Sequence, residues 1–128
     1  MLFRSRRDGL EVDRWNRLNP DKEPKQTWTQ TQLGNSKTPI IAVSDNMAAV
    51  PDMVRKWMPD NFEVLGTDGF GRSDTREALR RFFEVDGAAV ALAALSSLVR
   101  KGDIEASVYQ KAVKKFGVSS ERTDITEL

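Results

Sequence analysis

The sequence contains neither cysteine nor histidine among its 128 residues. Without cysteine the chain has no disulfide, no thiolate metal site and no cysteine nucleophile. Without histidine it lacks the commonest general base and the commonest metal ligand. We therefore expect no serine–histidine catalytic centre and no zinc site on this chain alone. The absence of cysteine fits a reducing compartment, and we expect a cytoplasmic protein.

An excess of either charge is also missing, since 20 basic and 19 acidic residues leave a net charge of +1. This balance provides no basic stripe for nucleic acid. No apolar run approaches the roughly 18 residues of a membrane-spanning helix, and the N-terminal apolar segment is too short for a signal peptide. We therefore expect neither a nucleic-acid nor a membrane partner. With 39% hydrophobic and 30% charged residues, the composition is typical of a globular domain with one modest core.

The first third of the chain predicts one helix followed by a long connection. A capping pattern that starts at Asp8 predicts a helix from there to a stop before Pro20. Residues 21–38 are polar and predict a connection with a short helical turn that starts near Trp28. A connection of this length is unusual inside a compact domain. Trp28 therefore either anchors on a surface outside this chain or covers the local core.

Two apolar segments predict strands. Residues 39–43 form a short branched run typical of a buried parallel strand, and residues 62–67 predict a second one. Between them we expect a helix over residues 46–58, capped by Asp45 and kinked or restarted at Pro51. Strand, helix and strand in this order form a right-handed parallel crossover.

The last third predicts three helices, each with start and stop signals. Asp74, Asp86 and Asp103 stand at the expected starts, and Gly102 and Gly117 at the stops of the last two. The order of elements predicts an α/β fold with two parallel strands, helices packed around them and a helical C-terminal end. Two strands alone cannot shield their faces and edges. The chain is therefore expected to be either mostly helical with a strand pair or part of a larger doubly wound sheet.

The glycine-rich loop of residues 66–73 lies where phosphate sites occur, between a strand and a helix start. Its spacing satisfies neither the dinucleotide nor the P-loop pattern, and flanking aspartates would repel a phosphate. A tight connection that uses the freedom of glycine is the simpler interpretation. Asp45, Asp68 and Asp74 follow strand ends and form a hypothetical divalent-cation cluster, but helix capping already explains Asp45 and Asp74.

A local run of arginines follows this loop. Arg76 and Arg80 share one face of the predicted helix at a spacing of four residues, with Arg72 upstream of them. Such a face suits a carboxylate partner on another chain, or plain solvation. No catalytic constellation emerges from the sequence.

Residues 65–86 resemble the C-terminal domain of the homodimeric-type decarboxylating components of pyruvate dehydrogenase, a transketolase-like C-terminal domain. The shorter core, Gly66-x-Asp68-x-Phe70-Gly71-x-Ser73, is similar to the corresponding segment of transketolases. Residues 7–20, 44–59 and 101–117 fit the same family. Residues 1–5 do not fit, and we interpret them as a non-native scar before a partial domain over residues 6–128.

The resemblance implies a fragment of an oxidoreductase that links glycolysis to acetyl-CoA formation. The full enzyme decarboxylates pyruvate with thiamine diphosphate and magnesium held between its other domains, and transfers acetyl to lipoyl groups of the dihydrolipoyl acetyltransferase component. No catalytic, cofactor or metal residue carries over to this chain, which is expected to be inactive alone. The resemblance implies a scaffold and homodimer-contact role beside the missing N-terminal domains. Our candidate contact residues are Asp68, Phe70, Arg72, Ser73, Arg76 and Arg80.

Two alternatives remain open at this point. The chain could be a freestanding interaction module derived from this domain, or a fragment of a transketolase-like enzyme with another substrate. An in-frame continuation upstream of Met1 into thiamine-binding domains would favour the fragment. A ribosome site at Met1 would favour the module.

Overall fold

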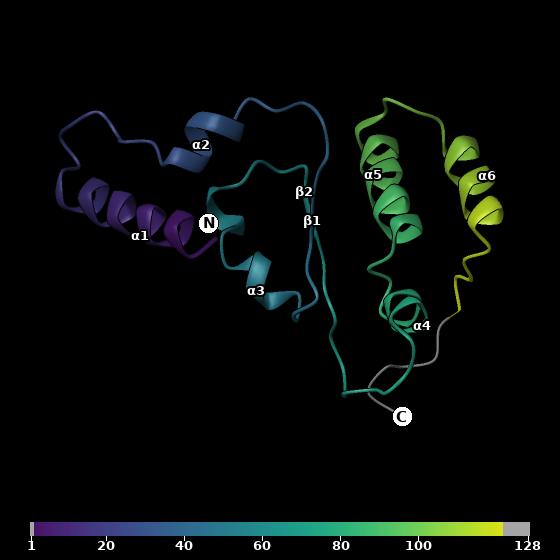
Figure 1. Cartoon of the computed structure of the whole chain (residues 1–128). Coiled ribbons are helices and arrows are strands. Elements are labelled where there is room, and N and C mark those ends of the chain that lie inside the picture. The colour runs from purple at the N-terminus through teal and green to yellow at the C-terminus, as the bar shows by residue number, and fades with distance from the viewer. Residues whose placement is uncertain (1, 122–128) are drawn as a thin grey trace.

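Two short parallel strands lie between helices in the computed structural model, which describes residues 2–121 (Figure 1). The elements are α1 (Leu2–Leu18), α2 (Trp28–Leu33), β1 (Ile40–Val43), α3 (Ala49–Asp52), the 3-10 turn η1 (Arg55–Trp57), β2 (Phe62–Leu65), α4 (Arg76–Phe82), α5 (Gly87–Lys101) and α6 (Ala106–Phe116). In Figure 1, α1, α2 and α3 lie on one side of the strands, and α5 and α6 on the other. This arrangement confirms the predicted α/β class. Met1 and the part of the predicted tail from residue 122 onward lie outside the described residues.

The core lies on one face of the strand pair. β1 and β2 run parallel, with Ile40 opposite Phe62. Phe62 is 4% exposed and forms one cluster with Val54 and Trp57, which are 4% and 6% exposed. Partly buried side chains surround this cluster: Leu2, Ile40, Ala42, Met53, Met58 and Val64. Alternation of side chains along both strands places the residues of one parity in this cluster.

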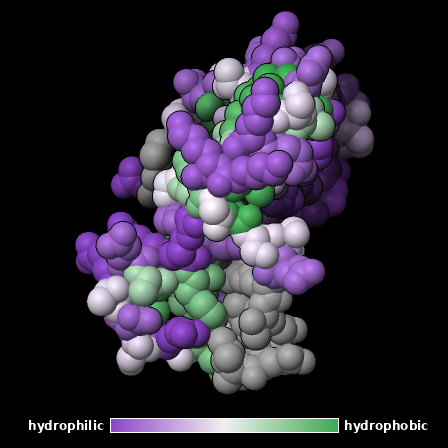
Figure 2. Space-filling model, turned by 90° about the vertical axis from the view of Figure 1, so that its right-hand side faces the viewer, coloured by the Kyte–Doolittle hydropathy of each residue, from purple (hydrophilic) through white to green (hydrophobic). Residues whose placement is uncertain are grey.

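The other face of the strand pair carries α5, which packs against β1 and α6. The Asp86 carboxylate accepts a hydrogen bond from the Ala89 N–H at 2.8 Å, and Gly102 ends the helix with a φ of 82°. Both features confirm the predicted boundaries of α5, whereas α6 begins after Glu105 rather than at Asp103. Only Leu92 and Ser97 of α5 are fully buried. Figure 2, which faces this side of the molecule, shows apolar atoms still visible between hydrophilic ones.

The indole of Trp57 fixes α1 to the core. Gly9 lies directly against this ring, and a Cβ at Gly9 would overlap it. The Asp13 carboxylate accepts hydrogen bonds from Trp57 Nε1 at 3.2 Å and from the Lys56 ammonium at 2.5 Å. The bond from Lys56 lowers the pKa of Asp13, an effect that partial desolvation opposes and the Trp57 bond supports. A glycine and a carboxylate on one helix thus hold a large aromatic side chain.

The first helix begins six residues earlier than the capping pattern predicted. Asp8 lies inside α1, and its carboxylate accepts a hydrogen bond from the Trp28 N–H at 2.8 Å instead of capping its own helix. The helix extends upstream because Leu2 packs against the core cluster. The long connection is also attached to α1, since Asn16 exchanges two hydrogen bonds with the backbone of Lys25 at 2.8 and 3.0 Å.

The helix predicted over residues 46–58, with a kink or restart at Pro51, is shorter and divided in the structure. Residues 49–57 form α3 and the separate 3-10 turn η1. Pro51 lies within α3, and its ring prevents the helix from extending further upstream. Asp45 does not cap this helix, because the Ala48 N–H is bound by the carboxylate of Asp68 from the other strand's loop. A long-range contact has replaced the local cap.

The stretch Arg76–Lys101 is long and apolar enough, by length and composition, to cross a membrane. The sequence pattern predicts two helices here, because the Asp86 cap divides the stretch. The structure also divides it: α4 and α5 are separate helices, and Glu84 between them takes a φ of 55°. A core helix of a soluble protein passes the same test of length and composition. The stretch therefore supports no conclusion about a membrane.

Replacing Gly9 by Ala tests the contact between α1 and Trp57. The added methyl group overlaps the indole, so we expect Gly9→Ala to lower the free energy of unfolding by about 1–3 kcal/mol. Urea denaturation followed by circular dichroism measures the change. Gly87→Ala is the matched control, because a Cβ at Gly87 meets nothing within 4 Å. Equal stability of Gly9→Ala and the unmodified chain would contradict the contact.

Candidate functional site

The loop between β2 and α4 is attached to the loop that follows β1. The Thr67 N–H donates to the Asn46 carbonyl at 3.0 Å, and Thr67 Oγ1 donates to the Asp45 carbonyl at 2.8 Å. The Ala48 N–H lies 3.3 Å from both carboxylate oxygens of Asp68. A Cβ at Gly66 would overlap the Ala48 backbone. Residues 66–68, the first part of this loop, therefore join the carboxyl ends of the two strands.

Beyond this attachment the loop turns away toward α4. Gly69 adopts a φ of 116°, a conformation that glycine tolerates and other residues rarely adopt. This confirms the interpretation of the loop as a connection that needs glycine. Thr75, not Asp74, is the N-cap of α4, and its Oγ1 accepts from the Ala78 N–H at 3.2 Å. The Asp74 carboxylate accepts instead from the Thr75 N–H at 2.7 Å.

An open hollow of about 730 Å³ lies between the loop, α4 and the end of β1. Apolar side chains of Val43, Leu79, Phe83 and Val85 line it together with arginine side chains; we call it the arginine-rimmed hollow. The complete lining is Val43, Ser44, Asp45, Thr67, Gly69, Phe70, Gly71, Arg72, Asp74, Arg76, Leu79, Arg80, Phe83 and Val85. Four of the six predicted contact residues, Phe70, Arg72, Arg76 and Arg80, thus surround one space.

The other two predicted contact residues do not line this hollow. Asp68 is turned toward Ala48, where it performs a structural task. Ser73 is exposed in the loop and is not part of the lining. The sequence predicted one contact for all six residues. In the structure Asp68 joins the two loops, four residues line the hollow, and Ser73 does neither.

The three arginines of the hollow differ in the contacts that their side chains make. The Arg72 guanidinium lies 4.3 Å from the centre of the Phe82 ring, in cation–π geometry. Within residues 2–121, the side chains of Arg76 and Arg80 form no ion pair and no hydrogen bond. Arg81, the next residue, is fully engaged: it pairs with Asp86 at 3.2 Å and donates to the Phe116 carbonyl at 2.6 Å.

The carboxylate-cluster hypothesis for Asp45, Asp68 and Asp74 is wrong. In the part of the chain that the structure describes, no group of three or more acidic side chains could hold a metal ion. Asp68 binds a backbone amide, and Asp74 binds the amide that follows it. The strand ends do meet at one edge, but their aspartates are directed to different partners.

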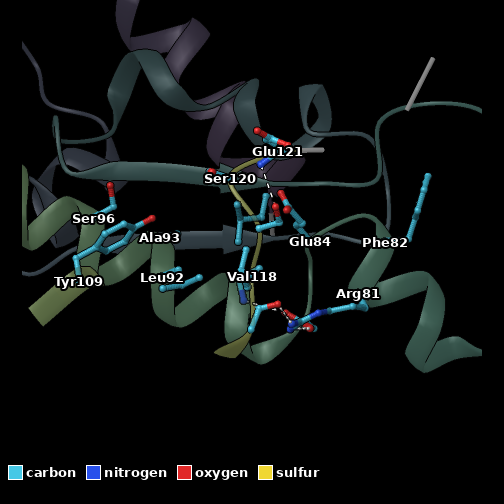
Figure 3. A pocket seen from close by; sticks show the side chains of 15 residues that line it. Arg81, Phe82, Glu84, Leu92, Ala93, Ser96, Tyr109, Val118, Ser120 and Glu121 are labelled. Atoms are coloured by element: carbon cyan, nitrogen blue, oxygen red, sulfur yellow. Dashed lines mark hydrogen bonds and ion pairs between the residues drawn. The ribbon is translucent and has the colours of Figure 1, made fainter. Parts of the chain in front are cut away.

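A second hollow of about 710 Å³ lies against another face of α4 (Figure 3). In this view Ser96 and Tyr109 lie at one end, and Arg81 and Glu84 at the other. Sequence reasoning assigned no role to this space. No local pattern could reveal it, because its walls come from β2, α4, α5, α6 and the segment after Gly117.

Comparison with known proteins identifies a family that the chain resembles in sequence. Residues 9–86 match the family described as the transketolase-like TK C-terminal domain. The chain is 50% identical over 118 residues to the pyruvate dehydrogenase E1 component of Pseudomonas aeruginosa, covering 91% of this chain and 13% of that protein. The E1 component of Cupriavidus necator is 43% identical over 112 residues, which cover 88% of this chain and 12% of that protein. The E1 component of Escherichia coli K12 is 40% identical over 119 residues, covering 92% and 13%.

Asp68→Ala tests the tie between the two strand ends. It leaves the Ala48 amide without its acceptor, so we expect a loss of about 1–2 kcal/mol in the free energy of unfolding. Thermal denaturation measures the effect. Asp45→Ala is the control, since this neighbouring carboxylate is exposed and its side chain makes no hydrogen bond within residues 2–121. Equal losses in both variants would show that the tie is unimportant.

Proposed function

The chain belongs to the transketolase-like C-terminal domain family, and on that basis we propose that it is the C-terminal scaffold and dimer-contact part of a pyruvate dehydrogenase E1 component. The whole enzyme would decarboxylate pyruvate with thiamine diphosphate and pass the acetyl group to lipoyl groups of an acetyltransferase component. The observation that carries the proposal is 50% identity across 91% of the chain to a protein of that name. We place the enzyme in the cytoplasm.

The contribution of this chain follows from its share of the enzyme. It spans 12 to 13% of the length of the curated relatives it matches. Within residues 2–121 the acidic side chains form no cluster that would hold the magnesium ion of a diphosphate. Because the chain spans so small a share of the enzyme, we assign the cofactor to other domains. No chemical step is assigned to this chain.

The long-range hydrogen bonds of the structure support a role in which this chain positions other parts of the enzyme. Trp57 binds α1 on one face of the strand pair, and Arg81 binds the end of α6 beyond the other. The loop after β2 is attached at its base by Asp68 and open at its outer part. A rigid base with an exposed outer surface supports a scaffold that contacts another subunit.

Calorimetric titration with thiamine diphosphate and magnesium tests the assignment of the cofactor. We expect no saturable heat from the purified 128-residue chain, and no decarboxylation of pyruvate, because it spans only 12 to 13% of its relatives and the cofactor is assigned to other domains. The E1 component of Pseudomonas aeruginosa is the positive control. A stoichiometric heat from the 128-residue chain would overturn the assignment.

A chimera tests the scaffold role in a working enzyme. The 118 matched residues of this chain replace their counterparts in the E1 component of Pseudomonas aeruginosa. We expect the chimera to form acetyl-CoA in the reconstituted complex, because the two segments are 50% identical and should pack alike. The same enzyme with these residues deleted should be inactive. A chimera that folds and dimerises but does not form acetyl-CoA would contradict the proposal.

A further inference from the structure

The arginine-rimmed hollow combines an apolar floor with arginine side chains. Leu79 on α4 and Phe83, which caps the end of this helix one turn later, form the floor with Val85. Phe70 stands at its edge and is 65% exposed. An exposed aromatic side chain next to arginines is the composition that interaction hot spots favour. The volume of about 730 Å³ lies within the usual range of binding pockets, about 300–1,000 Å³.

Arg76 and Arg80 are among several arginines that form no ion pair within residues 2–121, and Arg7 and Arg14 of α1 are others. What sets Arg76 and Arg80 apart is that both line the same apolar hollow. Residues four apart on a helix have Cβ atoms roughly 5–6 Å apart. Two guanidinium groups at this spacing can each bind a carboxylate through paired hydrogen bonds.

We propose that the arginine-rimmed hollow docks a segment of another polypeptide that presents two carboxylates beside an apolar side chain. This inference rests on the proposed function, since such a segment would belong to a neighbouring subunit of the assembly. The apolar side chain enters between Leu79 and Phe83, and the carboxylates bind Arg76 and Arg80. Arg72, held over the Phe82 ring, forms the side of the hollow at the loop.

The charges of the lining favour this occupant over a polyanion or a second copy of the hollow. Asp45 and Asp74 also line the space, so three arginines face two carboxylates. A phosphate chain would neutralise the arginines but has no apolar group to cover the floor of Leu79, Phe83 and Val85. A symmetric self-contact would bring the two arginine rims together, where like charges repel. A short acidic segment with an apolar centre reaches the arginines and fills the floor.

Fluorescence anisotropy with labelled probe peptides tests the proposal on the complete 128-residue chain. The acidic probe is Glu-Leu-Asp-Leu-Glu, and the neutral and polar comparison probes are Gln-Leu-Asn-Leu-Gln and Glu-Ser-Asp-Ser-Glu. We expect saturable binding of the acidic apolar probe and much weaker binding of the other two. Equal binding of the acidic probe and the polar one would overturn the role of the apolar floor.

Variants identify the surface that binds the probe. Arg76→Gln with Arg80→Gln should weaken binding at least about tenfold, because charge-assisted hydrogen bonds are lost. Phe70→Ala should weaken it several-fold while leaving the fold intact, since this side chain is exposed. Arg14→Gln with Arg17→Gln is the matched control on the exposed face of α1 and should leave the affinity unchanged. Circular dichroism checks that each variant is folded.

Three outcomes would overturn the proposal. The acidic apolar probe could fail to bind the unmodified chain, or bind the Arg76/Arg80 variant as tightly as the unmodified one. Analytical ultracentrifugation could also reveal a dimer of the chain that the Arg76/Arg80 variant abolishes, which would assign the hollow to a second copy. An active chimera together with any of these results would leave the proposed function standing and remove only the docking role. An inactive chimera with specific probe binding would do the reverse.

Discussion

Parallel pairing of β1 with β2 is the constraint from which the remaining structure follows. Because both strands run in the same direction, their carboxyl ends and the loops that follow them meet at one edge. The loop after β2 can therefore bind the loop after β1 through Thr67 and Asp68. Once that base is attached, the remainder of the loop and α4 stand over the end of β1 and enclose the arginine-rimmed hollow. The two faces of the same pair separate the Trp57 core from α5.

The loop that runs from Gly66 into α4 has two parts with different physical roles. Its first residues need close backbone approach and a carboxylate acceptor, which Gly66 and Asp68 supply. Its later residues present Phe70 outward beside Arg76 and Arg80, which form no ion pair within residues 2–121. One short segment thus connects the packing of the domain with an exposed surface.

Local signals predicted the bounds of α5 correctly but missed the starts of α4 and α6, where Thr75 and Glu105 are the N-caps instead of Asp74 and Asp103. Asp86 and Gly102 act within their own helix, and both boundaries were correct. Asp8 and Asp45 carry the same local capping signal, yet neither caps the predicted helix. Asp8 binds the start of α2, twenty residues downstream, and Asp68 binds the amide near Asp45 from across the strand pair. The sequence shows that a side chain can accept a hydrogen bond, but it does not show which backbone N–H will donate to it. Tertiary contacts decide that.

The sequence by itself determined the α/β class, the parallel pair and the family resemblance, because each depends on residue order and short-range pattern. It also identified the arginines of α4, since their spacing is a property of one helix. Only the tertiary structure decided that Asp68 is an internal tie while Phe70, Arg72, Arg76 and Arg80 share one hollow. The reason is physical: direction and burial of a loop side chain depend on what the fold brings next to it. For residues 66–75, that neighbour is the end of β1, about twenty residues away in the chain.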